Sequence, residues 1–71
     1  MACTRRFEFI APGSCKFWEI ALHEKEVTVR FGKIGTAGQS ITKDFADEAT
    51  AGKYAERMIR AKTAKGYVEN A

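Results

Sequence analysis

The residues of this sequence that could do chemistry are concentrated in one short stretch, residues 30–39, which reads RFGKIGTAGQ. It combines cations and an aromatic ring with closely spaced glycines, and its candidate binding residues are Arg30, Phe31, Gly32, Lys33, Gly35, Gly38 and Gln39. Glycines leave backbone N–H groups accessible, and such groups beside an ammonium can form a concave anion site. The stretch therefore predicts either an anion site centred on Lys33 or a tight turn that carries a solvated lysine.

The spacing of these glycines differs from that of the common nucleotide-binding loops. Gly32, Gly35 and Gly38 do not have the dinucleotide-fold spacing, a strand and not a helix is expected to follow them, and they form no Walker loop. The single histidine, His23, has no cluster of cysteines or carboxylates to complete a metal site, a triad or a general-base pair. We expect no catalytic residue, no metal and no cofactor.

Two residues of the stretch have competing interpretations. By alternation, Phe31 shares a face with Val27 and Val29, which makes it a core aromatic. Its exposed edge beside Gly32 could also serve as a stacking platform. Gln39 could donate a hydrogen bond to a phosphate, or it could hold the turn closed through its amide.

Further cations lie outside this stretch. Lys53, Arg57 and Arg60 form a row on the outer face of an expected helix, and Glu56 partly neutralises it. The row is either a solvated face or an auxiliary nucleic-acid contact, for which Lys53 and Arg57 are the candidates. Arg5, Arg6, Lys16 and Arg30 could form a second basic patch on the uncovered face of the sheet, with Phe17 among them, and Glu8 and Glu19 dilute it.

Length and composition predict one folded domain over residues 1–71. A chain of 71 residues is near the lower size limit for a domain with a hydrophobic core, and 45% of its residues are hydrophobic. Its formal charge of +3 weakly favours an anionic partner. Neither a signal peptide nor the ~18-residue apolar run of a membrane span is present, so a cytoplasmic protein without membrane contact is expected. Cys3 and Cys15 are expected to be free thiols, because a hairpin between them would hold them beyond disulfide reach.

Alternation and turn residues predict the elements that position these side chains. Strands are expected at residues 5–10, 15–23, 27–31 and 39–45, with a short last strand at 67–68. A helix is expected between an N-cap at Asp47 and a stop at Gly66. Its inner stripe comprises Ala51, Ala55, Met58, Ile59 and the stem of Lys62. The predicted class is α+β, an antiparallel sheet of four to five strands with one C-terminal helix packed on one face.

The apolar pattern also predicts a strand register. A tight turn at Glu24 and Lys25 pairs Leu22 with Val27, Ile20 with Val29, Trp18 with Phe31, Glu19 with Arg30, His23 with Glu26 and Phe17 with Gly32. In the fourth strand, Ile41 and Phe45 are expected to point inward. Lys43 falls between them on the same face, so it must extend its ammonium to solvent, or the strand must bulge or end early.

Three groups of residues, taken in order, resemble the WGR domain. They are Lys16-Phe17-Trp18-Glu19-Ile20, then Phe31-Gly32-Lys33-Ile34-Gly35 with Gly38-Gln39, and then Lys62 with Lys65-Gly66-Tyr67. This module is named for a Trp-Gly-Arg tripeptide and occurs in poly(ADP-ribose) polymerases and in bacterial proteins similar to the molybdate metabolism regulator. The resemblance covers residues 16–67. The tripeptide reads Phe31-Gly32-Lys33, which keeps an aromatic face and a charge without the indole N–H or the guanidinium fork.

The resemblance implies nucleic-acid binding without catalysis. In the polymerases, the tryptophan packs on the sugar at a DNA strand end, the arginine lies at DNA or interdomain contacts, and catalysis belongs to a separate domain. Phe31 and Lys33 would occupy these places in a module that contacts phosphates or strand ends, of DNA in preference to RNA. The alternative is a protein-interaction module that docks on a partner protein through its open sheet face or an edge strand. A monomer or a weak homodimer is expected.

Overall fold

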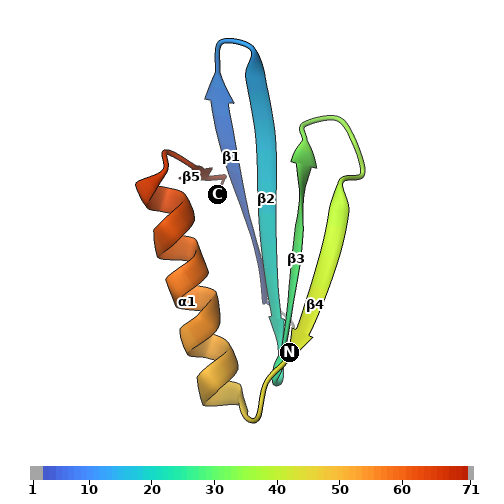
Figure 1. Ribbon diagram of the computed structural model, residues 1–71, viewed down its shortest axis with the longest axis vertical. Helices are drawn as coiled ribbons and strands as arrows, with labels where there is room; N and C mark the ends of the chain where they lie inside the picture. Colours follow the sequence, from blue (N-terminus) through green and yellow to red (C-terminus); the bar gives the residue numbers. More distant parts are fainter. Residues whose placement is uncertain (1–2, 71) are drawn as a thin grey trace.

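The computed structural model describes residues 3–70, which form the expected α+β architecture (Figure 1). Within these residues, one helix lies against one face of a five-stranded antiparallel sheet with the strand order β4-β3-β2-β1-β5. The elements in chain order are β1 (Cys3–Ala11), β2 (Ser14–His23), β3 (Glu26–Lys33), β4 (Gln39–Asp44), α1 (Glu48–Ala64) and β5 (Val68–Glu69). The last strand starts one residue later than predicted and pairs with β1, so β1 is the second strand from that edge of the sheet.

The register between β2 and β3 is the predicted one. The observed partners are Leu22 and Val27, Ile20 and Val29, Trp18 and Phe31, Glu19 and Arg30, His23 and Glu26, and Phe17 and Gly32. A slip by one residue would move the apolar set to the opposite face. This register therefore fixes which side chains lie beneath the helix and which face away from it.

The first hairpin separates the two cysteines as predicted. In its register Cys15 is opposite Ile10, while Cys3 is opposite Leu22 at the far end of the strands. Cys15 is a free, exposed thiol. The side chain of Cys3 lies outside the part of the chain that the structure describes.

The hydrophobic core lies between the sheet and α1. Phe7 and Trp18 are each 2% exposed, and their ring centroids are 5.6 Å apart. The helix contributes Ala51 and Ala55 to this core, and the small side chains let it approach the sheet closely. Of the predicted inner stripe, these two alanines are buried, and the larger residues that follow them are half-buried.

Both helix ends agree with the sequence signals. The Asp47 carboxylate accepts a hydrogen bond of 2.7 Å from the Thr50 N–H, which satisfies one free donor of the first turn. This hydrogen bonding lowers the pKa of Asp47 below its ordinary value. At the other end Gly66 has a φ of 108° and turns the chain towards β5, and Tyr67 packs its ring 5.4 Å from that of Phe9.

The fourth strand is less covered than the sequence predicted. The helix packs mainly against β2 and β3 and less against β4, and Ile41, expected to point into the core, is 52% exposed. The ammonium of Lys43 lies 5.3 Å from the ring centroid of Tyr54, and the residue is exposed, as expected for a lysine that extends to solvent. The strand also ends at Asp44, one residue before Phe45.

Gly52, inside α1, offers a direct stability test. A Cβ built on Gly52 has no atom within 4 Å, and alanine has the higher helix propensity. We expect Gly52→Ala to raise the free energy of unfolding by about 0.5–1 kcal/mol, measured by urea denaturation. A loss of stability would mean that the helix packs more tightly on the sheet at this position than the structure shows.

Candidate functional site

The loop between β3 and β4 is ordered by its own hydrogen bonds. The Ile34 N–H donates to the Cys15 carbonyl at 3.0 Å, and the Thr36 N–H donates to the Lys33 carbonyl at 3.1 Å. The Thr36 hydroxyl also donates to the Lys33 carbonyl, at 2.7 Å. Two of the N–H groups that could have held an anion are therefore used within the protein. The loop contributes to an anion site mainly by fixing the backbone at Lys33.

Two of the three glycines in this segment are required for close packing. A Cβ on Gly38, which has a φ of +72°, would lie 2.4 Å from the Phe31 carbonyl oxygen and 2.8 Å from Cζ of Phe17. A Cβ on Gly32 would lie 2.8 Å from Cα of Gly38. Gly35 differs, because it has a φ of +95° and open space around it. The loop therefore folds back over the sheet, on the face opposite to α1, and covers Phe17.

Phe17 forms a small second core on this outer face. It is 1% exposed although no helix covers that side. The guanidinium carbons of Arg6 and Arg30 lie 4.6 and 4.9 Å from its ring centroid, and Glu19 accepts hydrogen bonds from Arg6 at 2.7 Å and from Arg30 at 3.0 Å. Arg30 also donates to the Ala37 carbonyl at 2.8 Å. These contacts attach the loop to the outer face of the sheet.

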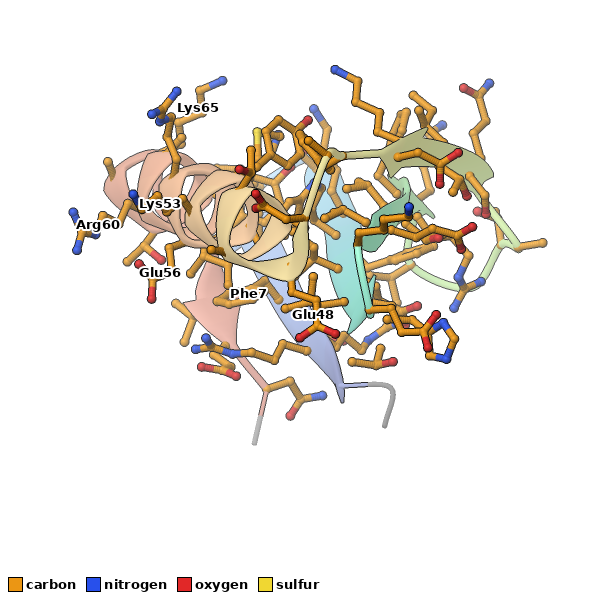
Figure 2. The ribbon with its side chains drawn as sticks, turned by 90° about the horizontal axis from the view of Figure 1, so that it is seen from below. Phe7, Glu48, Lys53, Glu56, Arg60 and Lys65 are labelled. Atoms are coloured by element: carbon orange, nitrogen blue, oxygen red, sulfur yellow. The ribbon has the colours of Figure 1, made fainter. Side chains whose placement is uncertain are left out.

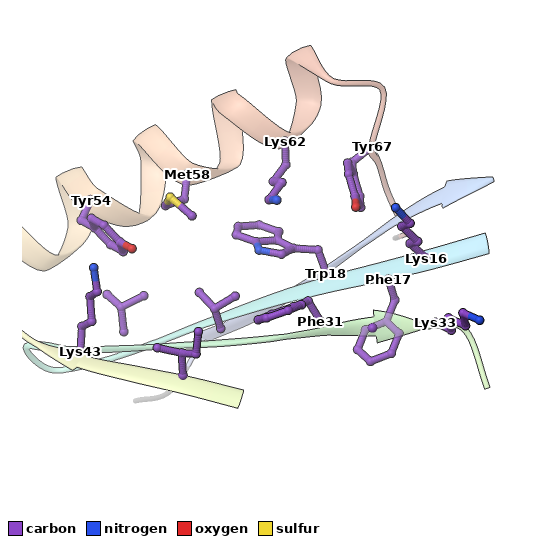
Figure 3. Close-up of a pocket in the computed structure, with 14 residues that line it drawn as sticks. Lys16, Phe17, Trp18, Phe31, Lys33, Lys43, Tyr54, Met58, Lys62 and Tyr67 are labelled. Atoms are coloured by element: carbon purple, nitrogen blue, oxygen red, sulfur yellow. The ribbon is translucent and has the colours of Figure 1, made fainter. Parts of the chain in front are cut away.

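Of the four cations predicted to form a patch on the uncovered sheet face, only Arg6 and Arg30 lie there. Both are bound to Glu19. Arg5 is opposite Ile20 and lies on the helix side, where it forms an ion pair with Glu69. Lys16 alternates with Trp18 and also lies on the helix side (Figure 3).

Glu19 links the outer-face ion pairs to the pH dependence of stability. Burial alone would raise the pKa of Glu19, but the hydrogen bonds from Arg6 and Arg30 outweigh it and hold the pKa below its ordinary value. Because the folded-state pKa is depressed, this stabilisation is complete above the unfolded-state pKa and is lost as pH falls through the folded-state pKa.

We expect Glu19→Gln to lower the free energy of unfolding at pH 7 by about 1 kcal/mol, because both guanidinium groups lose a charged partner. Between pH 5 and pH 3, the free energy of unfolding should fall less for this variant than for the natural chain, as measured by urea denaturation at each pH. Glu56→Gln, on the exposed outer helix surface, is the matched control. Parallel pH curves for Glu19→Gln and the natural chain would contradict this role of Glu19.

On the opposite side of the sheet, a groove of about 520 Å³ lies between α1 and strands β2, β3 and β4 (Figure 3). Its apolar walls are Trp18, Val27, Val29, Phe31, Ile41, Tyr54, Met58 and Tyr67. The helix contributes residues spaced by four, which lie on one face, and the strands contribute alternate residues. Trp18 is almost fully buried, while Phe31 is half-buried. Phe31 is therefore both a core residue opposite Trp18 and part of an accessible wall, so its two interpretations are compatible.

Four lysines complete the lining of this groove: Lys16, Lys33, Lys43 and Lys62. No carboxylate lines it, and within residues 3–70 none of the four lysines takes part in an ion pair. Lys16 and Lys33 are cross-strand partners, so two ammonium groups are held on neighbouring strands at one end of the groove. An anion would relieve the repulsion among these charges.

Lys62 is the lysine most affected by this environment. Its ammonium lies 5.8 Å from the ring centroid of Trp18 and 5.4 Å from that of Tyr67. Burial lowers the pKa of Lys62, and the positive charges of Lys65 and Lys16 lower it further. A bound anion would favour the charged form of Lys62 and so oppose this lowering of its pKa.

The predicted site residues are divided among three surfaces. Phe31, Gly32 and Lys33 line the groove, whereas Arg30 lies on the outer face. Gln39 is exposed opposite Phe31, and its side chain makes no hydrogen bond within the described residues. The turn is instead held by Thr36 and Arg30.

The cations predicted on the helix stay apart from this groove. Lys53 and Arg60 point away from the sheet in Figure 2, and Arg57 is exposed and absent from the groove lining. Sequence reasoning did not assign Tyr54, Met58, Tyr67 or the ammonium groups of Lys43 and Lys62 to a binding surface, and it placed Lys16 on the other face of the sheet. The available signal was the occurrence of lysines at inward-facing positions, where a hydrophobic residue would be expected.

No group of three or more histidine, cysteine or acidic residues is close enough to hold a metal ion within residues 3–70. In the same part of the chain, α1 is too short and too polar to cross a membrane.

Comparison with known proteins gives consistent results. A family model described as the WGR domain matches residues 1–71. Protein YehF of Escherichia coli K12 is 40% identical over 67 residues, which are 94% of this chain and 24% of that protein. The uncharacterized protein YfeS of the same organism is 38% identical over 66 residues, or 93% of this chain and 27% of that protein. The chain thus spans about a quarter of the length of these curated relatives.

A solved structure has the same fold as this chain. A crystal structure of a Bacteroides fragilis protein, from a structural genomics consortium, superimposes with a TM-score of 0.94 at 42% identity. The match covers 97% of this chain and 20% of that protein.

Proposed function

Since the chain belongs to the WGR domain family, we propose that it is a non-catalytic module that binds nucleic acid, DNA in preference to RNA, mainly through phosphates. Members of this family in poly(ADP-ribose) polymerases bind DNA. The observation that carries the proposal for this chain is the groove beside Phe31, where four lysines and no carboxylate surround an aromatic wall. Clustered ammonium groups beside accessible rings are the usual combination for nucleic-acid binding.

In the proposed complex, the end of the groove next to the glycine loop contacts the DNA backbone. Lys16 and Lys33 are fixed on neighbouring strands, so together they can contact adjacent phosphates. Lys62 faces the same end from the helix (Figure 3). Phe31 would pack its half-buried ring against the terminal sugar or base. Arg30 positions the loop through Glu19 and the Ala37 carbonyl and does not contact DNA itself.

Titration of a fluorescently labelled nicked duplex at several salt concentrations tests this proposal. Contact with three to four phosphates predicts that log K falls against log[salt] with a slope of about −3. Lys33→Gln should reduce this slope by about 0.9, because one phosphate contact is lost. Absence of binding at low salt would refute the proposal.

A second candidate function, docking on a partner protein, is favoured by one feature. Every residue of β4 is exposed, and this strand ends the sheet, so its outer backbone groups are available to another chain. Such a complex should survive nuclease treatment and ~0.5 M salt, whereas phosphate contacts should not. The outer sheet face is a poorer docking surface, because its arginines, Arg6 and Arg30, are already bound to Glu19.

A further inference from the structure

The groove extends well beyond the corner at Lys33. Figure 3 shows Lys16, Lys33 and Tyr67 at one end, and Lys43 with Tyr54 at the other. Positive charge therefore stands at both ends of the groove. A ligand that satisfies both ends must carry anionic groups on either side of an uncharged part.

The middle of the groove is apolar and can hold a flat group. Phe31 and Ile41 on the strands and Met58 on the helix line this part of the groove. The ring of Trp18 lies between Phe31 and the helix (Figure 3). Ile41 is 52% exposed, so it offers apolar surface that no other part of the described chain covers. The volume of about 520 Å³ lies within the roughly 300–1,000 Å³ typical of sites for small organic groups. Methionine and aromatic side chains adapt well to planar rings.

We infer, given the proposed function, that this groove takes an unpaired nucleotide at the end of a DNA strand. Its base enters between Phe31 and Met58, and the phosphates on either side of it contact Lys33 at one end and Lys43 at the other. A base within a duplex is stacked and paired, so it cannot enter a groove between a helix and a sheet. The module therefore prefers ends that carry a single-stranded tail over blunt ends.

The backbone of the groove favours a nucleotide over an acidic peptide strand. The groove floor includes β3, which is already paired with β2 on one side and β4 on the other. A peptide strand would find no free backbone donors or acceptors there, whereas a base needs only ring faces and the flanking charges. Recognition by stacking and charge is tolerant of base identity, so little sequence preference is expected.

Three labelled DNA probes that share one duplex test the inference. The first is blunt, the second carries a four-nucleotide single-stranded tail, and the third carries an abasic tail with the same number of phosphates. We expect the normal tail to bind about 10-fold more tightly than the blunt duplex, and the abasic tail to lose most of that gain. Equal binding of all three would overturn the inference and leave the proposed function standing. Absence of binding to any of them at low salt would remove the proposed function itself.

A matched pair of variants locates the preference in the groove. Ile41→Glu places a carboxylate on an exposed groove position and should abolish the preference for the tail. Ile10→Glu makes the same change at a position that is 71% exposed and outside the groove, and it should retain the preference. Equal tail preference in both variants would place the tail elsewhere. Displacement of the tail by an equimolar acidic peptide would also overturn the inference, in favour of a protein ligand.

Discussion

Reversing the charge of Lys16 and Lys33 together is expected to weaken binding to a nicked DNA duplex by about 100-fold at low salt, or roughly 2.7 kcal/mol. Lys16 and Lys33 are cross-strand partners at one end of the groove, so both ammonium groups should face the phosphates. Lys16→Glu with Lys33→Glu removes two attractions and adds two repulsions at that point. Both side chains are exposed, so folding should be unaffected. Fluorescence anisotropy measures the binding, and circular dichroism checks the fold.

The control makes the same change in net charge elsewhere. Lys53→Glu with Arg57→Glu reverses two exposed cations on the helix, outside the groove. Only the long-range field changes there, so binding should fall by less than about fivefold. Equal losses in the two double variants would show that binding follows net charge and that the groove has no special role.

Gly38→Ala is expected to lower the free energy of unfolding by more than about 3 kcal/mol. Its Cβ would lie 2.4 Å from the Phe31 carbonyl oxygen and 2.8 Å from Cζ of Phe17, and neither contact can be relieved by turning a flexible side chain. The positive φ of 72° adds a cost for any L-residue with a Cβ. A domain of 71 residues has a total stability on the order of 4–10 kcal/mol, so this loss would leave it marginal.

Gly35→Ala separates the two contributions to this cost. Gly35 also has a positive φ, but a Cβ there would have no atom within 4 Å. Gly35→Ala should therefore lower the free energy of unfolding by only about 1–2 kcal/mol, which is the conformational cost alone. Urea denaturation of both variants measures the difference. Equal losses would contradict the packing of Gly38 against Phe17 and the Phe31 carbonyl.

Much of the fold follows from local patterns in the sequence. The register between β2 and β3 could be predicted because three apolar pairs agree on one face and Glu19 meets Arg30 on the other. The helix could be delimited because Asp47 and Gly66 carry specific capping chemistry. In each case the deciding interactions lie between residues whose separation is set by the strand or helix period.

Some predicted placements differ from the structure. Arg5 and Lys16 are expected on the uncovered face, but each alternates with a core aromatic, Phe7 or Trp18, and therefore lies on the helix side. Ile41 was expected inside because β4 alternates, but the helix packs on β2 and β3 and leaves it half uncovered. The position of the helix across the sheet depends on how side chains from distant segments fit together, which alternation within one strand does not specify.

The candidate site could be predicted only in part for the same reason. Phe31 and Lys33, which line the groove, can be proposed from the sequence because they stand beside glycines in one stretch. The groove also requires Tyr54, Met58 and Lys62 from the helix, and these come into place only when α1 packs on the sheet. Arg30 was assigned to binding, but the fold of the loop directs it towards Glu19 on the other face.

Amide chemical-shift mapping by NMR with a short nicked duplex tests the central claim most directly. If the lysine-rich corner of the groove binds DNA, the largest shifts should fall on residues 16–18, 31–35 and 62. Residues 53, 57 and 60 on the outer helix surface, and residues 6 and 8 on the outer sheet face, should change little. Shifts concentrated on the outer helix or the outer sheet face, with the groove unchanged, would contradict the claim.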